Sequence, residues 1–419
     1  MSSVINNSNA NSAIVQTLDA SVSKRNPQIY STKEIYPAHS MTYVKNEKTN
    51  GSATDGNSIN FNLNKYGISS QILLHLEKTA VKSGGGADDA ASLMHGDIFT
   101  IIKSVELLSS SRVISTLTAN DLIAQFSDMT QDEYNVVFQK AISVGGTNAA
   151  GRWVFVLPLV FGLFKDINTQ PNLSFVEPMS LRVNFNKVGG YLTTTANSVF
   201  SLDDQNCYLQ VRYKAYPEAS VAEVIDQNYS EPELNQLSTR FYDENTIVKT
   251  LTANANAATI TEDIDLKNTD AVTDFYIVVR RQPNSGAAPT DAAVQNNSPF
   301  KITSVKFTGS GQDILNLTED ELAYTRLTDN GNAVFPIEIS TSTFGITKVV
   351  KIQTGLWNNY AMSNCFSLRE INAPRISISF EVPAHSGQAL TYEVNVVEDC
   401  LAIYSTSSAT GRQVLSLTN

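Results

Sequence analysis

The sequence predicts an all-β protein made of two tandem antiparallel sandwiches, each an eight-stranded jelly roll with short helices in its loops. Three observations support this fold class. Short runs alternate between apolar and polar residues along most of the chain, the turns between them are rich in Asn, Gly and Ser, and one 21-residue stretch occurs twice. With 419 residues, the chain can form two domains that each bury a substantial core.

The repeated stretch is the strongest sign of two similar domains. Residues 102–122 and 302–322 align without a gap and share eight of 21 residues, where average composition would supply roughly one or two. The shared pairs are Ile102/Ile302, Ser104/Ser304, Val105/Val305, Ser110/Ser310, Ile114/Ile314, Leu117/Leu317, Thr118/Thr318 and Leu122/Leu322. Two copies are too few for a solenoid, so we interpret them as two domains of one architecture.

An Asn- and Ser-rich segment, residues 1–30, opens the chain and is mildly basic through Lys24 and Arg25. It is either a disordered tail or an arm that orders on a neighbouring molecule. Its first twelve residues are polar and show no apolar core of a signal peptide. We therefore expect an N-terminal arm that precedes the first folded domain.

The first jelly roll is predicted to span residues 31–216. Ile59, Phe61 and Leu63 alternate with Asn residues, which is the period-two pattern of a half-buried strand. Further strands are expected at 72–78, 99–108, 113–117, 153–164, 181–185 and 207–213. The apolar run 153–164 is interpreted as a strand buried on both faces.

Both copies of the repeat are expected to leave their second strand through the start of a helix. Asp121 follows Thr118 at the third position, and Glu321 follows Thr318 at the same spacing. Each pair can form a capping box, the first in an Asp variant. A further helix is expected after Thr130.

Two segments lack strand alternation. Residues 79–96, with three consecutive Gly, are predicted to form a long loop, and residues 217–245, with seven acids against Arg240, an acidic linker that holds a short helix near 221–225. The second jelly roll is predicted to span 246–419. Its strands are expected near 247–251, 259–266, 275–280, 302–307, 334–339, 349–353, 376–380 and 390–396.

The composition argues against a nucleic-acid-binding surface. The formal net charge is −11, whereas binding to phosphate backbones needs clustered Lys and Arg. We therefore expect no sequence-specific contact with nucleic acid. The three cysteines are too few for a disulfide framework and suit a reducing compartment, each as a small buried residue; they are Cys207, Cys365 and Cys400.

We predict no catalytic, cofactor-binding or metal-binding residues, and therefore no enzyme. The four histidines have no metal-ligand spacing; they are His39, His75, His95 and His385. Glu262, Asp263 and Asp265 do not match a calcium-binding loop and are interpreted as acids on the face of a strand. An all-β fold could hold the paired carboxylates of a glycoside hydrolase, but nothing in the sequence nominates such a pair.

Three segments of the first half occur in a distinctive order. The strand and helix of 112–122 precede the aromatic-rich run 153–164, and 173–185 follows. Leu157, Pro158, Leu159 and Phe161 fit a V-P-L-x-F element, and Pro178, Leu181, Val183 and Phe185 fit a P-x-x-L-x-V-x-F element. In this order, and with the duplication, the chain resembles the major capsid proteins of tailless double-stranded DNA viruses, which are built from two tandem jelly rolls. The second half keeps only the later element, at 374–380.

The resemblance implies a structural protein without cofactors. It implies a homotrimer of pseudo-hexagonal outline that tiles the icosahedral capsid shell of a virion and is assembled inside the host cell. The implied partners are other copies of the chain, neighbouring capsomers, minor capsid or penton proteins and, at the arm of residues 1–30, an internal membrane or its proteins. The alternative is a two-domain β-sandwich carbohydrate-binding protein or adhesin, and an enzyme rival is a β-sandwich glycosidase or lyase.

Overall fold

The computed structural model is built almost entirely of antiparallel strands. It describes residues 40–53, 56–65, 68–82, 101–127, 152–165, 173, 177–186, 198–202, 206–215, 236–252, 256–267, 271–282, 300–322, 349–353, 366–384, 389–408 and 413–418. No helix among these residues has both the length and the apolar character needed to cross a lipid bilayer.

The first half forms two layers of four strands with one additional strand. The strands are β1 (Ser40–Gly51), β2 (Ser58–Asn62), β3 (Ile68–Lys82), β4 (Ile102–Ser109), β5 (Arg112–Thr118), β6 (Arg152–Pro158), β7 (Met179–Phe185), β8 (Ser198–Leu202) and β9 (Tyr208–Ala215). Sheet 1a has the order β1-β9-β3-β6 and sheet 1b the order β2-β7-β4-β5. The two layers are continuous through the pairing of β1 with β2, and β8 pairs with β3.

The second half repeats this order. Its strands are β10 (Gln236–Leu251), β11 (Ala258–Asp265), β12 (Ala271–Arg281), β13 (Lys301–Gly309), β14 (Gln312–Thr318), β15 (Val349–Gln353), β16 (Phe366–Ser367), β17 (Arg375–Val382), β18 (Leu390–Ser408) and β19 (Gln413–Thr418). Sheet 2a has the order β10-β18-β12-β15 and sheet 2b the order β11-β17-β13-β14. Strand for strand, the two halves have the same topology, and β16 and β19 are additions to sheet 2a. The predicted fold of two tandem eight-stranded jelly rolls is therefore confirmed.

The duplicated stretch adopts the same register in both halves. The six residue pairs that join β4 to β5 recur between β13 and β14, each shifted by 200 residues, and the bulge falls at the same step. Ser110 and Ser310, in the two hairpin turns, both have left-handed backbones with φ of 56° and 53°. The pairings of β4 with β7 and of β13 with β17 also share a bulge, directly after Ile102 and Ile302.

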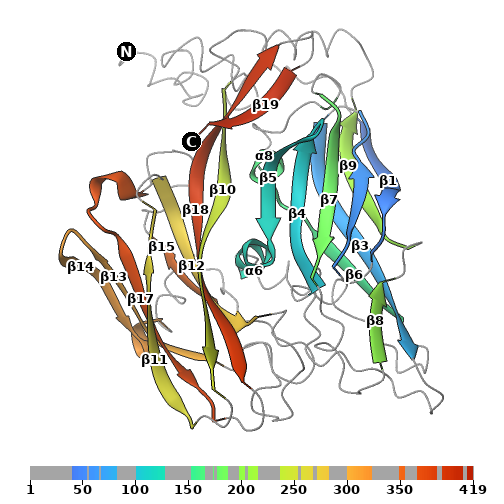
Figure 1. Ribbon diagram of the computed structural model, residues 1–419. Coiled ribbons are helices and arrows are strands. Elements are labelled where there is room, and N and C mark those ends of the chain that lie inside the picture. The colour runs from blue at the N-terminus through green and yellow to red at the C-terminus, as the bar shows by residue number, and fades with distance from the viewer. Residues whose placement is uncertain are drawn as a thin grey trace, which may run out of the picture.

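Four layers follow one another across the molecule, in the order 2b, 2a, 1b and 1a (Figure 1). One apolar core fills the space between sheets 1a and 1b, and a second fills the space between 2a and 2b. The alternating burial of β7, in which every second residue from Met179 to Phe185 is buried, shows how period two directs one face of each strand into a core.

The structure corrects three predicted boundaries. The run 153–164 is not one strand, because β6 ends at Pro158 and helix α8 (Gly162–Lys165) follows; a proline has no N–H to continue the ladder. Residues 236–245 of the predicted linker 217–245 belong to β10, which pairs with β18 along its whole length. Residues 79–82 of the predicted loop 79–96 extend β3, where they pair with β8.

Some predictions fall outside the described residues. These are the N-terminal arm 1–30, the helix after Thr130, the short helix near 221–225 and the strand at 334–339. The strand expected at 349–353 has these bounds in the structure. The helix expected after Thr118 is α6 (Ala119–Ser127), and a short 3₁₀ helix, η3 (Leu368–Glu370), precedes β17.

Candidate functional site: the polar junction between the two jelly rolls

Sheet 2a is covered on both faces. Along β12, Phe275 and Ile277 point into the core of the second jelly roll, whereas Tyr276 and Val278 join the core of the first. Val397 on β18 also packs into the first core. The outer face of sheet 2a is therefore the surface on which the first jelly roll packs, and the junction of the two domains lies there.

Helix α6 forms the side of the junction that the first jelly roll contributes (Figure 1). It lies against β18 and β15 of sheet 2a, and its residues 119–126 are all buried. Thr118 and Asp121 close the predicted capping box: the Thr118 amide donates to Asp121 Oδ2 at 2.7 Å, and the Asp121 amide donates to Thr118 Oγ1 at 3.1 Å. The cap fixes where the helix begins and so which of its side chains meet sheet 2a.

A hydrogen bond between side chains of the described residues crosses from one domain to the other. Asn120 Nδ2 on α6 donates to Glu244 Oε1 on β10 at 2.6 Å. Near this contact, burial, followed by the negative charges of Glu244 and Asp243, raises the pKa of Asp121 to about 7 against the lowering effect of the hydrogen bonds with Thr118. The junction therefore holds a carboxyl group that is close to half protonated at neutral pH.

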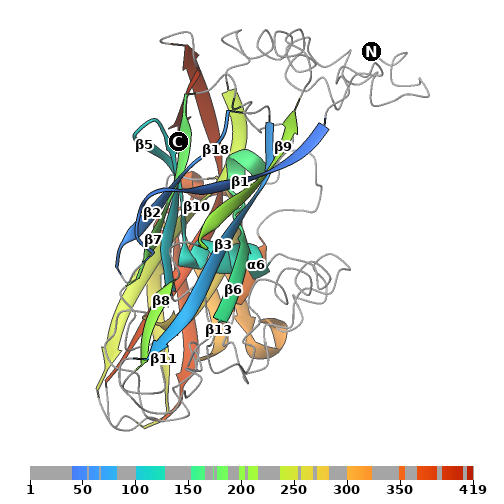
Figure 2. The same ribbon diagram turned by 90° about the vertical axis from the view of Figure 1, so that its right-hand side faces the viewer.

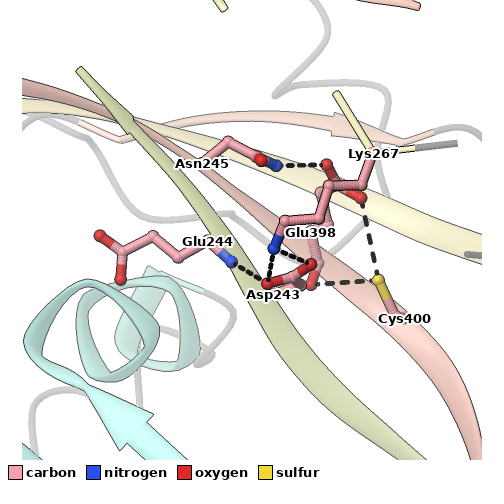
Figure 3. Close-up of polar contacts among 6 residues, drawn as sticks. All are labelled: Asp243, Glu244, Asn245, Lys267, Glu398 and Cys400. Carbon is pink, nitrogen blue, oxygen red and sulfur yellow. Dashed lines mark hydrogen bonds and ion pairs between the residues drawn. The ribbon is translucent and has the colours of Figure 1, made fainter. Parts of the chain in front are cut away.

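Further polar contacts link β10 and β18 on the opposite face of sheet 2a, which is turned toward the second core (Figure 3). Lys267 Nζ binds both carboxylate oxygens of Asp243, at 2.7 and 2.6 Å. Asn245 Nδ2 donates to Glu398 Oε1 at 2.6 Å, and the Cys400 thiol lies 3.7 Å from the Glu398 carbonyl oxygen. The carboxylates of Asp243, Glu244 and Glu398 thus each have a hydrogen-bonding or ionic partner.

A buried ion pair joins two strands of the same sheet. Arg280 Nε on β12 donates to Glu393 Oε1 on β18 at 2.5 Å, and both side chains are almost completely buried. Lys351 on β15 lies 3.6 Å from Asp274 Oδ1 and above the ring of Tyr276. These contacts satisfy charged groups on the outer face of sheet 2a, which the first jelly roll covers.

The acids on β11 that could have formed a calcium-binding cluster have structural partners instead. Glu262 accepts a hydrogen bond from the Tyr392 hydroxyl at 2.9 Å; burial of the phenol, together with this bond, raises the pKa of Tyr392. Asp263 and Asp265 lie on β11, as predicted, and both pair with Arg375 on β17. In the part of the chain that the structure describes, no group of three or more His, Cys, Asp or Glu side chains is arranged to hold a metal ion.

His75 and the cysteines also have structural surroundings. The His75 ring stacks on Tyr208 at 4.3 Å and lies 3.2 Å from Gln210 Oε1, and burial lowers the pKa of the imidazole. Cys207 and Cys400 are buried and form no disulfide among the described residues, which confirms the prediction of small buried residues for these two. Cys365 lies outside the described residues, as do His39, His95 and His385.

These features define a double-jelly-roll protein whose two domains pack through sheet 2a, helix α6 and the hydrogen bond between Asn120 and Glu244. No protein-family model matches the sequence, and no curated protein matches it. Solved structures do match. PBCV-1 VP54, in a crystal structure fitted into a reconstruction of the virophage Sputnik, is 12% identical over 92% of this chain and 98% of its own, with a TM-score of 0.61.

Two further matches are named as major capsid proteins. The Faustovirus protein is 9% identical over 94% of both chains with a TM-score of 0.61. The mavirus protein is 14% identical over 90% of both chains with a TM-score of 0.51. At these identities the likeness establishes the fold, and it extends across both jelly rolls.

Proposed function

We propose that this chain is the major capsid protein of a double-stranded DNA virus and that its role is structural rather than catalytic. The observation that carries the proposal is the packing of two jelly rolls of one topology in a single chain, through sheets 1b and 2a. Major capsid proteins of Faustovirus and mavirus share this fold over their whole matched length. The described polar groups fit this role, because they pair with one another across strands and domains.

In the proposed assembly, three chains form a ring of six jelly rolls that tiles an icosahedral shell of the virion. The domain division that we propose is an arm at 1–30, a first jelly roll at 31–216 and a second from Gln236 onward, with the linker shortened to 217–235. Other copies of the chain are the main partners, and penton or minor capsid proteins, or an internal membrane, are partners proposed for the arm. The host cell is the proposed place of assembly.

Sizing of the purified full-length chain tests this proposal. A trimer has a mass of about 137 kDa, three times the 45.7 kDa of the chain, and light scattering distinguishes it from a monomer. Electron microscopy of the concentrated protein should then show particles with a pseudo-hexagonal outline. A stable monomer that a glycan column retains would instead support the carbohydrate-binding alternative, which no described residue favours at present.

A further inference from the structure

The same isoleucine of the two repeats is buried in one jelly roll and exposed in the other. Ile114 and Ile314 lie at the bulges of hairpins that have one register. Ile114 is 5% exposed and Ile314 is 44% exposed. The start of the following helical turn differs in the same way, since residues 119–121 are buried and residues 319–321 are exposed. The two hairpins therefore share one register, but their surroundings in the molecule differ.

The cause of the difference is the cover that sheet 2a provides. In the first jelly roll, α6 lies against β18 and β15, and Asn120 binds Glu244 on β10. Sheet 2b, the counterpart of 1b, forms one end of the four-layer molecule, and sheet 1a, the counterpart of 2a, forms the other end (Figure 1). Each half of the junction thus has a counterpart at an outer end of the four-layer molecule, where no other sheet among the described residues covers it.

Two bulges align sheet 1a with sheet 2a residue by residue. The ladder between β3 and β9 has a bulge directly before Gln71. Gln71 pairs with Arg212 on β9, and Arg212 pairs on its other side with Tyr43 on β1. The corresponding bulge between β12 and β18 comes directly before Asp274. Asp274 pairs with Asp399 on β18, and Asp399 pairs on its other side with Tyr242 on β10. The pairs continue in step: Tyr43, Lys45 and Asn46 take the places of Tyr242, Glu244 and Asn245.

This alignment identifies exposed residues whose counterparts are buried within the chain. Tyr242 packs against the core of the first jelly roll, whereas Tyr43 is 55% exposed. Lys45, whose side chain is 52% exposed, takes the place of Glu244. Arg212 lies over the Tyr43 ring and Lys45 over that of Tyr208, so the outer face of sheet 1a combines aromatic rings with positive charge.

The opposite end of the molecule carries the complementary charge. Glu319, Asp320 and Glu321 begin the exposed helical turn of the second jelly roll, and Asp320 takes the place of Asn120 in the repeat. Asn120 and Glu244 are hydrogen-bonded within one chain. The residues that correspond to them, Asp320 and Lys45, lie at opposite ends of the molecule and bear opposite charges. The contact of Lys45 with Glu47 is an exposed pair at 3.4 Å, and such pairs are weak enough to exchange.

We infer that the exposed segment 314–321 of one copy docks on the outer face of sheet 1a of a second copy, with Asp320 opposite Lys45 of that copy. This pairing rests on the trimer proposed above and specifies which surfaces join its chains. The two surfaces differ and lie at opposite ends of the layer order, so the contact is head to tail and can close into a ring. Figure 2 shows the face of sheet 1a that would receive the neighbour, with β1, β9 and β3 toward the viewer.

Charge reversal tests the pairing in the full-length protein. Lys45→Glu and Asp320→Lys each place like charges in every contact between copies, so each should raise the protein concentration at which half of the trimer dissociates by at least about tenfold at low salt. The double variant Lys45→Glu/Asp320→Lys restores opposite charges and should return to within about threefold of the wild type. Lys249→Glu, which changes an exposed lysine on β10, is the matched control and should leave the dissociation unchanged.

Light scattering over a dilution series gives the readout, and circular dichroism verifies that each variant is folded. Tyr43→Ser provides a second variant without a charge change and should also weaken the trimer. The inference is overturned, while the proposed function stands, if the wild type is a trimer and both charge reversals and Tyr43→Ser leave it as stable as before. A double variant no more stable than its single parents would equally rule out the contact between Asp320 and Lys45. A monomeric wild type would overturn the proposed function itself.

Discussion

Asp121 and Glu321 occupy equivalent positions in the two copies of the repeat, yet the pKa values of their carboxyl groups are shifted in opposite directions. Burial raises the pKa of Asp121 to about 7. Hydrogen bonds from the Thr318 amide and hydroxyl lower the pKa of Glu321, which is exposed. Local sequence places both acids where they cap a helix, and the domain junction alone makes the first of them hard to ionise.

The first prediction concerns the pH dependence of stability. Because the pKa of Asp121 is raised from 3.8 to about 7 by folding, its contribution is greatest below pH 4, declines as the pH rises toward 7, and is then constant. Asp121→Asn keeps an oxygen for the Thr118 amide and removes the ionisation. The free energy of unfolding of the variant, relative to wild type, should therefore rise by roughly 2–4 kcal/mol between pH 4 and 7 in denaturant titrations.

Glu321→Gln is the control for this experiment. A carboxyl group whose pKa is lowered by folding loses its contribution only as the pH falls through acidic values. The difference between Glu321→Gln and wild type should therefore be constant between pH 6 and 8. If the difference between Asp121→Asn and wild type were also constant from pH 4 to 7, it would contradict the burial of the Asp121 carboxyl group at the domain junction.

The second prediction concerns the buried ion pair of sheet 2a. Arg280→Met leaves the Glu393 carboxylate buried without its partner, so it should lower the free energy of unfolding by roughly 3–5 kcal/mol. Replacing both residues, as Arg280→Met/Glu393→Leu, should recover most of this loss. Lys306→Met, which breaks an exposed pair with Asp313, should cost about 0–1 kcal/mol. Equal losses for the buried and exposed pairs would contradict the burial of sheet 2a.

The third prediction uses the repeat as its own control. Gly311 has a left-handed backbone with φ of 75°, and a Cβ added there would meet no atom within 4 Å. Gly311→Ala should therefore cost about 1 kcal/mol through backbone strain alone. Ser111, its counterpart, is a described residue without a positive φ, so Ser111→Ala should be nearly neutral. Thermal unfolding of the two variants gives the comparison.

The fourth prediction concerns the core of the second jelly roll. Phe380 contacts Phe300 and Tyr392 with ring centroids 5.7 and 5.4 Å apart. Phe380→Ala should lower the free energy of unfolding by roughly 3–5 kcal/mol because it leaves a cavity among these rings. Val248→Ala, at an exposed position of β10, should change it by less than about 0.5 kcal/mol. A small loss at Phe380 would mean that the rings do not form a packed core.

Strand patterns and the duplication were sufficient to predict the fold, because each depends on local sequence. Val105 and Val305 were expected to be equivalent, and both are fully buried at the same step of the same register. The capping boxes at Thr118 and Thr318 were predictable for the same reason, since three residues of spacing determine them. Such signals report which face of a strand or helix is apolar.

The junction could not be predicted, because its residues are polar and buried only through the meeting of two domains. Asp243 and Glu244 made 236–245 resemble an acidic linker, although these residues form a strand in which Lys267 pairs with Asp243 and Asn120 donates a hydrogen bond to Glu244. Strand β1 was missed for a related reason, because residues such as Lys45 on its outer face obscure the apolar alternation. The end of β6 at Pro158 has a local cause in the sequence, because proline lacks the N–H that a strand ladder requires.

The burial of sheet 2a on both faces has a consequence for synthesis on the ribosome. Translation delivers the N-terminal half first, so helix α6 emerges before any residue of β10 or β18 exists to cover it. The part of the first core that lies between sheets 1a and 1b can form at that stage, since domains fold as units in order of synthesis. The later half then packs its sheet 2a against helix α6 of this folded domain. Premature release of the nascent polypeptide would leave this surface of the first jelly roll exposed to solvent.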